Sequence, residues 1–250
     1  MSMADAVVEF RGVRKTFDHD EVLRGVTFAL FRGTTLAVMG ASGEGKTVLL
    51  RLVAGLIKPD AGEARLFGTN IVPLREEQLL PLRRRMGFVF QGAALFDSLS
   101  VFDNVAYPLR EHTNWGESEI ATRVGQFLGL VGLSGTERLL PQELSGGMKK
   151  RVGIARALVT EPEVVLFDEP TAGLDPTNAR IIAELIAQLR RGLCDTAIVV
   201  THDIEFARLV ADRMAILHEG RFIAAGSPDE IHGSPNPTVQ AFLAGELREA

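Results

Sequence analysis

The spacing of apolar residues predicts strands at the start of the chain. Residues 7–17 and 22–31 alternate apolar and polar side chains, the period-two pattern of half-buried strands. Residues 36–39 form a short apolar run that ends at Gly40, and the apolar spacing of residues 46–57 is helical. The chain is therefore expected to begin with paired strands, followed by a strand, a glycine-rich loop and a helix.

The pattern changes after the first third of the chain. It is mostly helical between residues 101 and 160, and strands and helices alternate on either side of that stretch. The other elements expected are strands at 63–67, 86–91, 164–167 and 196–200, and a helix at 177–191. This order predicts a parallel α/β core with a helical subdomain inserted at about residues 92–160. We expect one domain over residues 7–245, with residues 227–250 as a helical tail interrupted by prolines.

Composition adds limits on the class of protein. The 250 residues are 46% hydrophobic and 24% charged, which is ordinary for a globular domain, and the net charge of −5 disfavours a nucleic-acid partner. The single cysteine, Cys194, is expected to be a small buried or half-buried residue. No signal peptide is expected, and no apolar run approaches the roughly 18 residues that span a bilayer. A membrane role would need a membrane component on another chain.

One segment carries a specific chemical signal. Residues 40–47 read GASGEGKT, the GxxxxGK[ST] phosphate loop, between a predicted strand and a predicted helix. Glycines let backbone N–H groups turn toward phosphate oxygens, and the helix N-terminus adds its positive dipole end. Lys46 is expected to reach the phosphates and the Thr47 hydroxyl to bind Mg²⁺. The predicted ATP-binding residues of this loop are Gly40, Ala41, Ser42, Gly43, Glu44, Gly45, Lys46 and Thr47.

Two acids follow the apolar strand predicted at residues 164–167. Asp168 is the expected Mg²⁺ ligand, and Glu169 is expected to polarise the attacking water. Alone, such a pair is more often a strand ending in solvated acids. The phosphate loop elsewhere in the chain favours the catalytic interpretation.

The LSGGM segment opens a predicted helix. Ser145 suits a helix N-cap, and Gly146 and Gly147 give a backbone that a phosphate can approach closely. An ordinary capped helix would explain Ser145 but not the double glycine.

The phosphate loop, this segment and the later DEPTAGLD run resemble, in their order, an ABC-type ATPase. The resemblance implies a P-loop NTPase core of ABC type with an N-terminal antiparallel β subdomain and an inserted helical subdomain. It also implies a homodimer in which Ser145, Gly146 and Gly147 contact the γ-phosphate of ATP held by the other subunit. The family usually has LSGGQ, so Met148 is a departure.

The same resemblance assigns further roles. Gln91 would link Mg²⁺ and water to the helical subdomain, Asp175 would lie in the D-loop at the dimer interface, and His202 would hold the γ-phosphate and catalytic water. Phe17 stands where the family stacks an aromatic ring on adenine, although a lone Phe at a strand end is more often core. The other histidines are expected to be ordinary surface residues.

The segment after Gln91, at residues 92–96 and 101–113, is similar to the ATPase of Mla-type phospholipid transporters. That similarity implies a membrane permease, an MCE-domain protein and a small STAS-type regulator as partners, at the cytoplasmic face of the inner membrane. Leu95, Phe96, Phe102 and Tyr107 suit either the core of the insert or a permease-docking surface. The alternatives are another cargo (organic solvent, amino acid or peptide), a soluble ABC protein of translation or DNA maintenance, and a regulator without turnover.

Overall fold

The computed structural model describes residues 6–246, so the last four residues of the predicted tail lie outside the described part. The chain divides into two compact units, Met1–Arg85 with Asp195–Ala250 and Met86–Cys194. Each is described below by itself. The predicted limits of the single domain and of its helical insert remain predictions.

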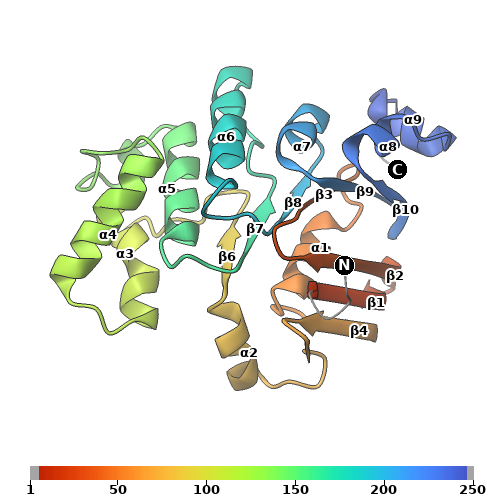
Figure 1. Ribbon diagram of the computed structural model, residues 1–250, viewed down its shortest axis with the longest axis horizontal. Coiled ribbons are helices and arrows are strands. Elements are labelled where there is room, and N and C mark those ends of the chain that lie inside the picture. The colour runs from red at the N-terminus through yellow and green to blue at the C-terminus, as the bar shows by residue number, and fades with distance from the viewer. Residues whose placement is uncertain (1–5, 247–250) are drawn as a thin grey trace. The chain divides into compact units, whose positions relative to one another are not determined.

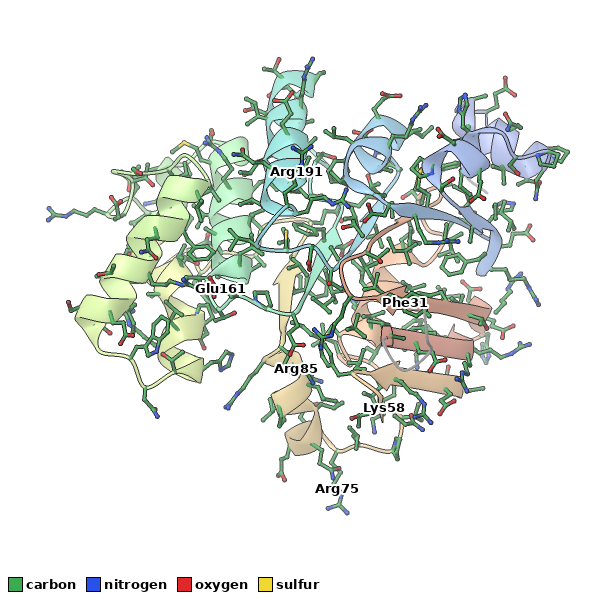
Figure 2. All side chains as sticks on the ribbon, in the orientation of Figure 1. Phe31, Lys58, Arg75, Arg85, Glu161 and Arg191 are labelled. Carbon is green, nitrogen blue, oxygen red and sulfur yellow. The ribbon has the colours of Figure 1, made fainter. Side chains whose placement is uncertain are left out.

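An antiparallel sheet forms the N-terminal part of the first unit (Figure 1). Its strands, in the order β2-β1-β4-β5, are β2 (Asp20–Phe31), β1 (Ala6–Phe17), β4 (Ala61–Leu66) and β5 (Thr69–Asn70). Val8 and Phe10, two positions apart on β1, are both buried, as the alternating pattern requires. Arg85, labelled in Figure 2, lies with its guanidinium 3.6 Å from the centre of the Phe67 ring. The expected antiparallel β subdomain is confirmed.

A second group of strands in the first unit carries the phosphate loop. Strand β3 (Thr35–Met39) pairs in parallel with β8 (Ala197–Thr201) on one side and β9 (Arg213–His218) on the other, and β10 (Arg221–Gly226) is antiparallel to β9. Every residue of β3 and β8 is buried, which explains their unbroken apolar runs. Helix α1 (Lys46–Val53) contacts β8, and α7 (Ile204–Val210) contacts β3.

The C-terminal tail packs on this same unit. It forms the two short helices expected, α8 (Pro228–His232) and α9 (Pro237–Leu243). Ile231, Val239 and Phe242 are buried in one cluster with Met39 of β3 and Ile216 of β9. The described part of the tail is therefore tied to the core of its own chain.

The second unit combines two parallel strands with helices. Strand β6 (Met86–Val89) pairs with β7 (Val164–Asp168). Its helices are α3 (Val101–His112), α4 (Glu117–Leu130), the 3-10 helix η2 (Pro141–Glu143), α5 (Gly146–Leu158) and α6 (Pro176–Leu189). Helices α3, α4 and α5 pack against one another (Figure 1), which confirms the predicted helical stretch. Glu161, labelled in Figure 2, follows α5 and pairs with Arg123 of α4 at 2.8 Å.

Several short elements were not predicted. They are β5, α2 (Glu76–Arg83), α7, β9 and β10. Helix α2 contains Pro81 and buries only Leu79, so it has no apolar periodicity to detect. Helix α1 ends at Val53, earlier than predicted, and Gly55 soon follows with φ +64°.

Candidate functional site

The phosphate loop is folded around its own lysine. It connects β3 to α1, whose N-cap is Gly45. Lys46 is buried, and its Nζ donates to the carbonyl oxygens of Gly40 and Ala41, both at 2.9 Å. The loop therefore curls as a phosphate cradle needs, with its ammonium group held inside the curve.

Two glycines in this loop are required by close approaches. A Cβ on Gly40 would lie 2.4 Å from the carbonyl oxygen of Leu217 in β9. Gly45 has φ +93°, and a Cβ there would lie 2.8 Å from Cγ1 of Val22 in β2. The loop is thus packed between β9 and β2, and both positions exclude a side chain.

Glu44 places a carboxylate in a loop that would bind phosphate, and the structure shows where that charge is directed. Its Oε1 lies 2.8 Å from His218 Nδ1, and its Oε2 accepts a hydrogen bond from the Glu219 backbone N–H at 2.5 Å. The expectation that His218 is an ordinary surface residue is therefore wrong. It lies half-buried at the end of β9, in contact with the phosphate loop.

Strand pairing places His202 at the same sheet edge as the phosphate loop. Met39 of β3 lies opposite Thr201 of β8 in a parallel pair, so Gly40 and His202 both follow at the carboxyl ends of neighbouring strands. The His202 side chain is exposed. Phe17, at the end of β1, is 42% exposed with Lys15 Nζ 5.2 Å from its ring centre, so it is not a core residue.

In the second unit, a parallel pair brings the acids and Gln91 to one edge. Val89 of β6 lies opposite Phe167 of β7. Gln91 follows β6 as an exposed residue, whereas Asp168 and Glu169 are buried. Glu169 has φ +44°, a conformation that costs a non-glycine residue on the order of 1–3 kcal/mol. Such strain at a buried acid is typical of functional sites.

A lysine that the sequence did not single out joins these two segments. Lys150 of α5 is only 6% exposed, and its Nζ donates to the carbonyl oxygens of Gln91 and of Glu169, the latter at 3.3 Å. Burial lowers the pKa of Lys150, and the charges of Glu169 and Asp168 oppose that shift. In the sequence it is one of three consecutive basic residues, so nothing marked it as buried.

The second glycine of the pair has an explanation within the chain. The Ser145 hydroxyl caps α5 by accepting from the Met148 N–H at 3.3 Å, as predicted. A Cβ on Gly147 would lie 3.0 Å from Asn178 Oδ1, and Asn178 Nδ2 donates to Asp175 Oδ2 at 2.6 Å. That hydrogen bond is the main cause lowering the pKa of Asp175. The LSGGM segment and Asp175 thus lie together at Asn178.

The candidate metal ligands suit Mg²⁺. Thr47, Gln91 and Asp168 offer hard oxygen donors, which Mg²⁺ prefers. Within residues 6–246, no group of three or more His, Cys, Asp or Glu side chains could hold a metal ion.

The comparison with known families decides the identity. The profile of the family described as "ABC transporter" matches residues 23–172. This chain belongs to the ABC transporter family. It is an ATP-binding subunit that hydrolyses ATP, as the motifs predicted. In residues 6–246, no helix is long and apolar enough to cross a membrane.

Individual relatives of this ABC ATPase support the same family assignment. It is 41% identical to the intermembrane phospholipid transport system ATP-binding protein MlaF of Escherichia coli K12, over 96% of this chain and 89% of MlaF. It is 40% identical to the probable ribonucleotide transport ATP-binding protein mkl of Mycobacterium tuberculosis H37Rv, over 95% of this chain and 66% of mkl. The fold matches a dimeric post-hydrolysis structure of the ATP-binding cassette MJ0796 bound to ADP and Pi. The TM-score is 0.82 at 31% identity, covering 88% of this chain and 98% of that one.

Proposed function

We propose that this ATPase works as a homodimer on the cytoplasmic face of the inner membrane, where it energises the transport of phospholipid or a related hydrophobic substrate between bacterial membranes. The membrane component would be a permease on another chain, associated with an MCE-domain protein and a small STAS-type regulator. The phospholipid assignment rests on the 41% identity over nearly the whole chain to the ATPase of a phospholipid transport system. The Mla-like segment after Gln91 adds to it.

We assign the nucleotide contacts of the first unit as follows. Phe17 stacks on adenine, which its exposed ring allows. Residues 40–47 bind the phosphates, with Lys46 contributing its charge and Thr47 its hydroxyl. His202, at the same sheet edge as the loop, holds the γ-phosphate and the attacking water.

The second unit is assigned the hydrolytic residues. Glu169 accepts the proton of the attacking water, and Gln91 orients that water. Thr47, Gln91 and Asp168 are proposed to hold Mg²⁺, which would neutralise charge on the phosphates. What supports this assignment is the buried acidic pair at the end of β7, beside the strand that leads to Gln91.

Ser145, Gly146 and Gly147 are proposed to serve the ATP held by the other subunit. Ser145 and Gly146 are exposed at the start of α5, and backbone N–H groups at a helix N-terminus suit a phosphate. The test is to mix Lys46→Ala subunits with Ser145→Arg subunits. Each heterodimer should retain at most one intact nucleotide site, while Ser145→Arg monomers should keep near-normal ATP affinity. A mixture no more active than the two variants measured separately would show that the sites are not shared.

An aromatic pair is the proposed permease-docking surface. Phe96 and Tyr107 are 44% and 42% exposed, and their ring centres lie 5.0 Å apart. Phe102 is half-buried, so Phe96 is the better candidate for a contact. A docking side chain is dispensable for folding and needed for assembly. Phe96→Ala should therefore keep the melting temperature and basal ATPase activity but lose copurification with the permease.

Leu209→Ala, an equally exposed apolar position on α7, is the matched control and should copurify normally. If Phe96→Ala unfolds the protein or retains the permease, the docking surface is wrong. Cells lacking this ATPase should accumulate misplaced phospholipid in the outer membrane, restored by the wild type but not by Phe96→Ala. An unchanged lipid distribution would favour another cargo, such as the ribonucleotides named for mkl, and would leave the ABC assignment intact.

A further inference from the structure

One face of α5 holds the segment that follows Gln91. Lys150 Nζ donates to the Gln91 carbonyl oxygen, and Arg156 donates to those of Ala93 and Ala94 at 2.7 and 2.8 Å. Between them, Gly153 approaches so closely that a Cβ there would lie 3.3 Å from the Cβ of Ala93. The positions 150, 153 and 156 share one face of the helix. The backbone of residues 91–94 is therefore fixed to α5.

Lys150 also reaches the end of β7. Its second acceptor is the carbonyl oxygen of Glu169, which also accepts from the Ala172 N–H at 3.1 Å. These two hydrogen bonds hold a residue whose φ of +44° is unfavourable for a side chain of its type. Strained backbone persists only where its surroundings determine it, and Lys150 is part of those surroundings.

We propose that Lys150 is a positioning residue for ATP hydrolysis, fixing the backbones of Gln91 and Glu169 relative to each other through one buried ammonium group. This inference rests on the proposed roles of Gln91 and Glu169. Lys150 does not touch the reacting atoms. It acts by holding the two residues proposed to orient and activate the water, and small misplacement of such groups is costly. Because Ser145 is the N-cap of α5, the same helix also links the LSGGM segment to both residues.

The experiment compares Lys150→Met, Lys150→Arg and the neighbouring control Lys149→Met. Met keeps the length of the apolar stem and removes the donors, whereas Arg restores donors on a similar stem. With Mg-ATP, Lys150→Met should lower kcat about 10- to 100-fold, while KM and nucleotide affinity stay within about threefold. Lys150→Arg should recover most of kcat, and Lys149→Met should match the wild type.

A second measurement needs no nucleotide. In the free protein, amide hydrogen exchange should become faster in Lys150→Met both at residues 91–94 and at residues 169–172, and return toward the wild-type rate in Lys150→Arg. A change in only one segment would contradict a joint constraint. If Lys150→Met does not fold, Lys150→Gln takes its place, since a neutral amide still supplies a donor. That variant should fall between Lys150→Arg and the loss expected for Met.

Two results would overturn the proposal. One is a folded Lys150→Met or Lys150→Gln variant with wild-type kcat. The other is a stable Lys150→Arg variant whose kcat stays as low as that of Lys150→Met. Glu169→Gln, measured alongside, separates this failure from that of the proposed function. If Glu169→Gln hydrolyses ATP normally, the roles assigned to Gln91 and Glu169 are wrong. If Glu169→Gln is inactive but Lys150→Met has wild-type kcat, those roles stand and only the positioning role of Lys150 is wrong.

Discussion

The phosphate loop and the acidic end of β7 are built in different ways. In the loop, Lys46 bonds carbonyl oxygens only five and six positions away, so one contiguous motif contains both the functional groups and their support. At the end of β7, Glu169 is supported by Lys150, which is 19 positions from it and 59 from Gln91. The Lys46 contacts lie within one motif, so they can be predicted from the sequence. The Lys150 contacts with Gln91 and Glu169 depend on how α5 packs, so they cannot.

The largest expected effect on activity comes from a substitution at the acidic end of β7 that leaves the phosphate loop unchanged. Glu169→Gln removes the proposed proton acceptor but keeps the size of the side chain, so kcat should fall about 10²- to 10⁴-fold. ATP binding should persist, because the residues of 40–47 are unchanged. The variant should therefore form an ATP-bound dimer, detected by size-exclusion chromatography with Mg-ATP.

Glu184→Gln is the control, because Glu184 is exposed on α6 and pairs with its exposed helical neighbour Arg180. Its kcat should stay within about twofold of the wild type, as surface substitutions generally have small effects. Wild-type turnover by Glu169→Gln would remove Glu169 from the mechanism.

A smaller effect is expected from a substitution that forces the phosphate loop to move. Gly40→Ala places a Cβ 2.4 Å from the Leu217 carbonyl oxygen, so either the loop or β9 must move. The free energy of unfolding should fall by about 1–3 kcal/mol, and nucleotide affinity should fall with it. Urea denaturation without nucleotide measures the first, and titration with ATP the second.

Gly192→Ala is the matched control, since a Cβ there meets nothing within 4 Å and φ is not positive. It should leave stability within about 0.5 kcal/mol. If Gly40→Ala is equally harmless, the close approach to β9 does not constrain the loop.

These differences explain what the sequence could predict. The apolar runs of β3, β7 and β8 and the helical stretch were readable because each buries a periodic or continuous set of residues. Helix α2 could not be predicted, because it has one buried residue and an internal proline. The residues proposed for chemistry came from motifs and resemblance. Lys150 and His218 did not, because their importance lies in contacts between distant parts of the chain.

The phosphate loop also depends on one distant side chain, because His218 at the end of β9 contacts Glu44 of the loop. Glu44 contacts both His218 and the backbone N–H of Glu219, so the loop is not supported by its own residues alone. Glu44→Ala should therefore destabilise the nucleotide-free protein more than His218→Ala, since it loses both contacts.

The double variant Glu44→Ala/His218→Ala should destabilise less than the sum of the two single variants. The difference is the coupling energy between the side chains, expected to be about 0.5–1.5 kcal/mol for a partly buried pair. Arg180 and Glu184, an exposed pair on α6, should give only about 0.3–0.5 kcal/mol in the same cycle. Unfolding free energies from urea denaturation provide all the terms. Additive effects at Glu44 and His218 would mean that these two side chains are not coupled, and that His218 does not support the phosphate loop through Glu44.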